Sequence, residues 1–149
     1  LRKSVSAAGG GNRSVEKEVD LTRSYLNIIK QRFLGRFSYE ISVHRDCYDV
    51  EIPPLVFQSV IENAVKFGVA KISGESHIFL SISRSKDQLI VSVINQGRTT
   101  INATSQESLG LKITEAILKT EYGDAYKLTS TPLTDGFRVD FLLPLKSQS

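Results

Sequence analysis

Three polar side chains interrupt an apolar helical segment near the middle of the chain. Glu62 and Lys66 are spaced four residues apart, and Asn63 and Lys66 three apart. Residues at these spacings share one face of a helix. A carboxylate, an amide oxygen and an ammonium group together suit Mg²⁺ with a polyphosphate, because Mg²⁺ takes hard oxygen ligands and Lys supplies charge to phosphate. The spacing therefore points to a metal and phosphate site.

The simpler interpretation of these residues is a solvated stripe with an ion pair between Glu62 and Lys66. Such a pair stabilises a helix by only about 0.2–0.5 kcal/mol. Asn63 argues against this interpretation, because Asn is unfavourable inside a helix and its neighbours Ile61, Ala64 and Val65 are apolar. The helix is thus expected to be largely buried around these polar groups.

Two further segments could complete such a site, although each is a weak signal alone. Asn95 and Gly97 end a predicted strand in a polar turn, and Ser108-Leu109-Gly110-Leu111 opens a predicted helix. The free N–H groups at a helix N-terminus can receive phosphate. The chain between them is polar, which predicts a loop of about ten residues that is long enough for a lid.

Other reactive side chains give no support to a hydrolytic site. His44 and His77 lack a Ser, Cys or carboxylate at the spacing of a nucleophile–base pair, so we interpret both as surface or half-buried residues. Cys47 is the single cysteine, which excludes an internal disulfide and a Cys-based metal site. A reducing compartment is the simplest interpretation.

Hydrophobic periodicity predicts the elements that must position these residues. In chain order they are a helix over Val15–Phe33 capped by Ser14, a strand over Phe37–Val43, a helix from Pro53-Pro54 to Gly68, strands over His77–Arg84 and Gln88–Ile94, a helix over Leu109–Thr120, and strands over Ala125–Thr131 and Phe137–Pro144. Strands that follow one another without helices predict a mixed sheet with its helices on one face. The fold class is therefore a two-layer α+β sandwich.

Composition limits the domain count and the partners. The 149 residues are 40% hydrophobic and 23% charged, which fits one core and argues against disorder. No apolar run approaches the roughly 18–20 residues that span a bilayer. The net charge of +3 is below the basic excess of typical nucleic-acid-binding domains, so no nucleic-acid partner is expected. The Gly-rich residues 1–13 predict a linker before a domain at 14–149. The absence of Met and the start at Leu1 suggest a fragment or processed product.

In their order and spacing, the three polar segments resemble the N, G1 and G2 boxes of the GHKL ATPase superfamily, and most closely those of LytS-type sensor histidine kinases. IPPLVFQSVIENAVKFGV resembles the N box and the residues leading into it, and is the most specific match. SLGLKITEAILKTEYG resembles the G2 helix, and DGFRVDFLLPL resembles the closing strand. The resemblance covers nearly the whole chain and implies the Bergerat type of α/β sandwich.

The resemblance implies ATP and Mg²⁺ as cofactors. It makes Asn63 the Mg²⁺ ligand, Glu62 the acid that orients or polarises the phosphoryl acceptor, and Lys66 a phosphate contact. Asn95 takes the adenine-contacting position, and Gly97 lets the turn approach closely.

The G2 part of the resemblance concerns the second phosphate contact. Gly110 and Leu111 are expected to open the phosphate-facing helix, with Ser108 donating to phosphate. The loop Arg98–Glu107 is expected to be the ATP lid.

Three positions depart from the family pattern. Asn95 replaces the usual Asp, and Thr99 and Ser108 replace glycines of the G1 and G2 boxes. An Asn oxygen accepts from the adenine amine without charge assistance, which weakens binding by roughly 1 kcal/mol. Conversely, Asn95→Asp is expected to gain about 1 kcal/mol, unless desolvation of the carboxylate cancels the gain. Thr99 and Ser108 restrict backbone conformations that Gly would allow.

The resemblance implies a catalytic domain of a two-component kinase, which supplies the γ-phosphoryl group of ATP to a histidine on a separate upstream helix. Neither His44 nor His77 lies in a matching context. Implied partners are the phosphoacceptor and dimerisation helix of the same full-length chain and a response regulator. The full-length protein is expected to be a homodimeric, membrane-anchored bacterial protein with this domain in the cytoplasm. The alternative is a degenerate, non-catalytic GHKL module that acts in regulation or docking.

Overall fold

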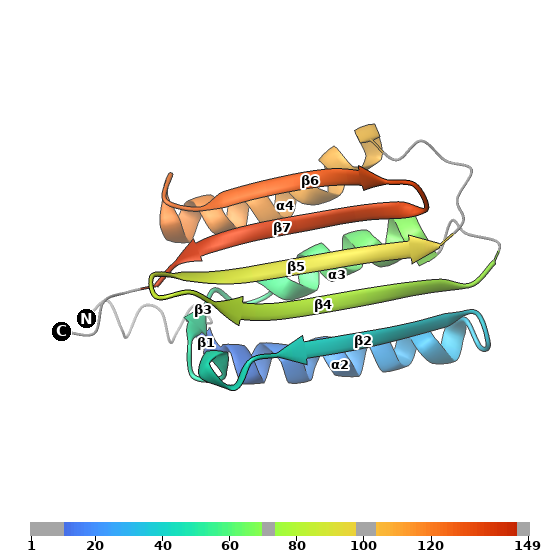
Figure 1. The fold of residues 1–149 in the computed structure, drawn as a ribbon, viewed down its shortest axis with the longest axis horizontal. Helices are drawn as coiled ribbons and strands as arrows, with labels where there is room; N and C mark the ends of the chain where they lie inside the picture. Colours follow the sequence, from blue (N-terminus) through green and yellow to red (C-terminus); the bar gives the residue numbers. More distant parts are fainter. Residues whose placement is uncertain (1–10, 70–73, 98–103, 146–149) are drawn as a thin grey trace.

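The computed structural model describes residues 11–69, 74–97 and 104–145, and for residues 104–110 only the backbone. Its α-helices all lie on one face of a five-stranded sheet (Figure 1). The strand order is β2-β4-β5-β7-β6, in which β2 and β4 are parallel and the other pairs antiparallel. The predicted two-layer α+β sandwich with a mixed sheet is confirmed.

The elements have the following bounds. The sheet contains β2 (Phe37–Val43), β4 (Ser76–Arg84), β5 (Gln88–Gly97), β6 (Lys127–Leu133) and β7 (Gly136–Pro144). The helices are α2 (Val15–Arg32), α3 (Val56–Ala64), which continues into the π-helical turn η2 (Val65–Val69), and α4 (Thr104–Tyr122). The short strands β1 (Arg13–Ser14) and β3 (Glu51–Ile52) pair with each other, and the 3-10 turn η1 (Arg45–Cys47) lies between β2 and β3.

The first helix and the first long strand follow the sequence prediction closely. Ser14 caps α2 by accepting a hydrogen bond from the backbone N–H of Lys17 at 3.1 Å, which satisfies one of the free donors of the first turn. β2 has the predicted bounds. Arg13, which the prediction places in the linker, pairs instead with Ile52 in the small sheet.

The second helix extends beyond its predicted end. Gly68 does not terminate it, because the chain continues through η2 to Val69 with π-helical geometry. Such short π-helical segments occur frequently at functional sites. Gly68, the predicted terminator, instead leaves space for the side chain of Asn95.

The structure also corrects the predicted end of β5. Asn95 and Gln96 pair with Phe137 and Gly136 of β7, so the strand continues three residues past Ile94 to Gly97. Asn95 and Gly97 lie in a strand rather than in a polar turn. The sequence prediction relied on the polar character of these residues, but their pairing with β7 keeps them in the strand.

The start of α4 is a further correction. The helix begins at Thr104 rather than Leu109. Hydrophobic periodicity does not detect the first turn, because the residues of that turn are polar. Ser108, Gly110 and Leu111 lie inside the helix, where N–H groups bond to carbonyls four residues earlier. The prediction that Gly110 and Leu111 open this helix is wrong. Of the predicted lid, residues 98–103 lie outside the described residues, and the rest forms the first turn of α4.

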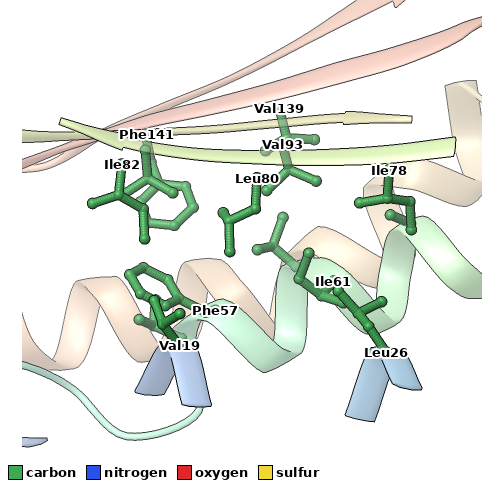
Figure 2. Packing of buried hydrophobic residues seen from close by; sticks show 14 of the residues in the cluster. Val19, Leu26, Phe57, Ile61, Ile78, Leu80, Ile82, Val93, Val139 and Phe141 are labelled. Carbon is green, nitrogen blue, oxygen red and sulfur yellow. The ribbon is translucent and has the colours of Figure 1, made fainter. Parts of the chain in front are cut away.

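The hydrophobic core lies between the sheet and the helices. Alternate residues of β4 point into it, because successive side chains of a strand face opposite sides of the sheet. The labelled residues of Figure 2 show the packing: Val19 and Leu26 of α2, Phe57 and Ile61 of α3, Ile78, Leu80 and Ile82 of β4, Val93 of β5, and Val139 and Phe141 of β7. Burial of each large side chain stabilises the fold by about 1.5–3 kcal/mol, and this packing fixes α3 against the sheet. Of the helices described, none is both long and apolar enough to cross a membrane.

Candidate functional site

The end of α3 and the end of β5 meet at one place in the fold. The Nδ2 atom of Asn95 donates a hydrogen bond to the backbone carbonyl of Ala64 at 3.1 Å, and the Asn95 side chain is buried. Ala64 is the last residue of α3 and follows Asn63 directly. The contact therefore brings the predicted metal segment and the predicted base segment together.

Two glycines make room for Asn95. A Cβ atom at position 68 would overlap the amide of Asn95, and a Cβ atom at position 136 would overlap its backbone carbonyl. Gly136 also has φ +152°, a backbone conformation that other residues rarely adopt. Only glycine at these two positions allows Asn95 to lie as it does.

The orientation of the Asn95 amide follows from its partner. A backbone carbonyl only accepts hydrogen bonds, so the NH₂ group must point at Ala64. The Oδ1 atom of Asn95 is then left buried and without a partner. This residue presents a single, fixed hydrogen-bond acceptor.

Asn63 is less satisfied still. The residue is 3% exposed, and neither its Oδ1 nor its Nδ2 atom has a hydrogen-bond partner. An unpaired buried polar group costs about 1–3 kcal/mol, and such groups in a native fold call for an explanation such as an ion or ligand. Both polar atoms of the Asn63 amide therefore lack a protein partner, and its role as a site residue stays a prediction.

Glu62 and Lys66 are exposed. The Oε2 atom of Glu62 accepts a hydrogen bond from Nε2 of Gln58 at 3.0 Å, and Nζ of Lys66 lies 5.3 Å from the ring centroid of Phe67. Among the described residues no ion pair joins Glu62 to Lys66, so both charges remain available to a ligand. Burial raises the pKa of Tyr25 on α2, and the nearby Glu62 carboxylate raises it further.

The remaining predicted site residues lie at the end of β5 and in α4. The backbone N–H of Gly97 donates to the carbonyl of Asp135 at 2.7 Å, which closes the end of β5 onto the β6–β7 turn. Leu111 is 7% exposed and belongs to the hydrophobic core, so its side chain serves packing. The backbones of Ser108 and Gly110 lie in α4, and the side chain of Ser108 lies outside the described residues.

Sequence reasoning missed the residues that hold Asn95. The carbonyl of Ala64 carries no sequence signal, because every residue has one. Gly68 follows an apolar helical pattern, where a glycine is typical of a helix end, so its contact with Asn95 has no separate sequence signal. Gly136 directly precedes the predicted strand Phe137–Pro144, and in the structure it leaves space for the Asn95 backbone.

The donor set fits Mg²⁺ bound together with phosphate. In the described part of the chain, no three His, Cys, Asp or Glu side chains are placed to hold a metal ion. Mg²⁺ commonly keeps few protein ligands and takes its other oxygens from phosphates and water. The unpartnered Oδ1 of Asn63 supplies one hard oxygen of this kind.

Comparison with known proteins places the relatives of this chain among sensor proteins and sensor histidine kinases. No protein-family model matches the chain. It is 25% identical over 159 residues to the sensor protein LytS of Staphylococcus epidermidis, which covers 99% of this chain and 27% of LytS. It is 23% identical over 133 residues to the sensor histidine kinase BtsS of Escherichia coli, covering 89% of this chain and 24% of BtsS. The chain thus spans about a quarter of the length of these curated relatives.

Solved structures share the fold. The catalytic domain of the histidine kinase ThkA superposes with a TM-score of 0.68 at 15% identity, covering 92% of this chain and 97% of that domain. ThkA in complex with the response regulator protein TrrA gives a TM-score of 0.66 at 15% identity, covering 91% of this chain and 41% of the kinase. The chain is therefore related in sequence to the LytS-type sensor histidine kinases and has the fold of a histidine kinase catalytic domain.

Proposed function

We propose that this chain is the ATP-binding catalytic domain of a two-component sensor histidine kinase. It binds ATP with Mg²⁺ and supplies the γ-phosphoryl group to a histidine on a separate upstream segment. The observation that carries the proposal is the pair of buried asparagines, Asn63 and Asn95, whose oxygens lack partners at the junction of α3 and β5. The comparisons do not favour the non-catalytic alternative, because the matched proteins are kinases.

The base subsite is built on Asn95. Its fixed Oδ1 accepts a hydrogen bond, and the exocyclic amine of adenine donates one. Guanine presents a carbonyl oxygen at the equivalent position, which would face the Asn95 oxygen without a proton between them. This subsite therefore favours adenine over guanine nucleotides.

The phosphate subsite is built on α3 and η2. Oδ1 of Asn63 holds the metal, and the ammonium group of Lys66 contacts phosphate from the exposed side of η2. When bound, Mg²⁺ neutralises charge on the phosphates. The exposed carboxylate of Glu62 orients or polarises the incoming phosphoryl acceptor.

The second phosphate contact moves to the new start of α4. Free N–H groups occur only in the first turn of a helix, which here begins at Thr104. We therefore place the phosphate-facing N–H groups in residues 104–107 in place of Gly110 and Leu111. Ser108 follows directly, and its hydroxyl remains a candidate phosphate donor, while Gly97 keeps the end of β5 free of a side chain.

The proposed partners follow from the proposed reaction. They are the phosphoacceptor and dimerisation helix of the same full-length chain and a response regulator, as in the ThkA complex with TrrA. We place the domain on the cytoplasmic side of a membrane-anchored, homodimeric bacterial protein, where ATP is available.

A calorimetric titration tests the function. Wild-type protein is expected to bind ATP more tightly with Mg²⁺ than without, and Asn63→Ala is expected to lose this dependence, because the other unpartnered buried oxygen at this junction, Oδ1 of Asn95, is assigned to the base. The matched control is Asn27→Ala, which removes an exposed asparagine of α2. Absence of binding by the wild type at about millimolar Mg·ATP, a concentration equivalent to only about 4 kcal/mol of affinity, would favour the non-catalytic module.

A nucleotide comparison tests the base subsite separately. ADP is expected to bind more tightly than GDP, because only adenine donates to Oδ1 of Asn95. Leaving the buried acceptor without a donor, as guanine would, costs about 1–3 kcal/mol of binding free energy. Equal affinities for the two nucleotides would show that Asn95 does not face the base.

A further inference from the structure

Among the residues that the structure describes, Glu18 is the one charged residue that is buried. It lies on the inner face of α2, and its residue is 1% exposed. It also belongs to the acidic first turn of this helix. Its contacts give it a second task, because both carboxylate oxygens are bound by groups outside α2.

One oxygen holds the start of α3. Oε1 of Glu18 accepts a hydrogen bond from the backbone N–H of Leu55 at 3.0 Å. Leu55 is the N-cap of α3, has no side-chain cap, and adopts the left-handed conformation with φ 69°. It is the one non-glycine residue of the described chain with positive φ, and such conformations persist only where surrounding contacts enforce them.

The other oxygen is bound from the N-terminal side. Oε2 of Glu18 pairs with Nη1 of Arg13 at 3.0 Å. Arg13 belongs to β1, which pairs with Ile52 of β3, three residues before Leu55. The side chain of Arg13 is 32% exposed, so it is the accessible member of this buried pair.

These contacts form a chain from the N-terminal segment to the candidate site. Arg13 neutralises Glu18, Glu18 fixes the strained cap at Leu55, and Leu55 starts the helix that carries Asn63. The other end of that helix is fixed by the bond between Ala64 and Asn95. If Arg13 withdrew, Glu18 would be left as a buried charge without its ionic partner, which is strongly unfavourable.

We propose that Glu18 is a positioning residue for the nucleotide-binding end of α3, and that Arg13 controls it. The segment that enters the domain at Arg13 thereby sets the affinity for Mg·ATP through the helix start at Leu55. This inference rests on the proposed function for its ligand, and on the apo protein alone for its geometry.

The first experiment measures amide hydrogen exchange of the nucleotide-free 149-residue protein. Glu18→Ala is expected to speed exchange in residues 55–63 of α3 and to leave α4 unchanged. Glu18→Gln keeps an acceptor for Leu55 and is expected to restore protection. The control is Glu16→Ala, which removes an exposed carboxylate of the same helical turn. Wild-type exchange over residues 55–63 in Glu18→Ala would overturn the proposal, whether or not the protein binds ATP.

The second experiment measures Mg·ATP affinity on folded protein, well below its melting temperature. Glu18→Ala is expected to weaken binding about fivefold or more, as in typical couplings between sites, with Glu18→Gln close to wild type. Arg13→Ala is expected to show a smaller loss in the same direction. A melting temperature that falls while the affinity of the folded protein stays at the wild-type value would reduce Glu18 to a structural role and overturn the proposal. If Glu18→Ala does not fold, Arg13→Ala carries both experiments, since its side chain is partly exposed and its β1 backbone pairing is unaffected.

Discussion

Asn63 and Asn95 are both buried asparagines at the candidate site, but the fold treats them differently. Asn95 is held by the carbonyl of Ala64 and by space left at Gly68 and Gly136, and only its Oδ1 is free. Asn63 has no partner for either polar atom of its amide. Protein groups alone thus hold Asn95 at the strand end, whereas the amide of Asn63 at the helix end has no protein partner.

This difference has consequences for stability. At Asn95 one hydrogen bond both orients the free acceptor and joins α3 to the sheet, so the side chain stabilises the fold. At Asn63 the unpartnered amide opposes folding, and the packing of Phe57 and Ile61 in the core outweighs its cost. Substitutions should therefore have opposite effects on stability at the two positions.

The largest expected effect is that of Asn95→Asp on stability. A carboxylate would place an oxygen against the carbonyl of Ala64 where Nδ2 now donates. Burial raises the pKa of such a carboxyl. Its penalty is therefore absent at low pH, where the protonated group can donate, and grows as the pH rises above about 4. We expect a loss of about 3 kcal/mol at pH 8, measured by urea unfolding at several pH values.

Asn27→Asp, at an exposed position of α2, is the matched control for this series. The gain in adenine affinity that the sequence predicts for Asn95→Asp concerns the folded protein and stays a separate prediction. Equal unfolding free energies for Asn95→Asp and wild type at pH 8 would show that Ala64 does not fix the amide.

Gly68→Ala tests the space around Asn95. The new Cβ would overlap the Asn95 amide and force it away from Ala64. We expect a loss of about 1–3 kcal/mol, as for other overpacked cores, together with weaker ADP binding. The control is Gly74→Ala, where nothing lies within 4 Å of the added Cβ. If both substitutions leave stability unchanged, the close approach of Gly68 and Asn95 is not maintained in solution.

Leucine, which has nearly the shape of asparagine, separates the two positions most directly. Asn63→Leu removes two unpartnered polar atoms and is expected to stabilise the apo protein by about 1 kcal/mol while abolishing Mg²⁺-dependent nucleotide binding. Asn95→Leu removes the bond to Ala64 and is expected to destabilise by about 1–2 kcal/mol. Thermal unfolding of the two variants measures both signs. A destabilised Asn63→Leu would mean that Asn63 has a partner in the apo protein.

The smallest effect concerns the other end of α3. Burial raises the pKa of Glu18 above its ordinary value of 4.5, although the Leu55 N–H and Arg13 act in the opposite direction. A raised pKa favours the folded state at low pH, and this contribution is lost as the pH rises. Glu18→Gln does not titrate, so its stability relative to wild type should increase slightly from acidic to neutral pH. Parallel unfolding measurements on Glu16→Gln, an exposed control, should show no such trend.

Much of the architecture could be predicted from the sequence because hydrophobic periodicity reports burial directly. The bounds of β2 and the start and cap of α2 follow local rules of spacing and capping. The predicted ends of helices and strands were wrong where the residues there do not follow a hydrophobic pattern. The polar first turn of α4 has no hydrophobic period, and the last residues of β5 are held by their partners in β7.

The same division holds at the candidate site. The residue types alone supply the chemical groups that are available: a carboxylate, two amides and an ammonium group on segments of predictable secondary structure. Which polar atoms stay free depends on the packed fold, because Asn95 bonds to Ala64 and Glu18 bonds to Leu55 across elements that are distant in the chain. A hydrogen bond between two elements depends on both of their positions, and those positions are set by the packing of the whole core rather than by either segment alone.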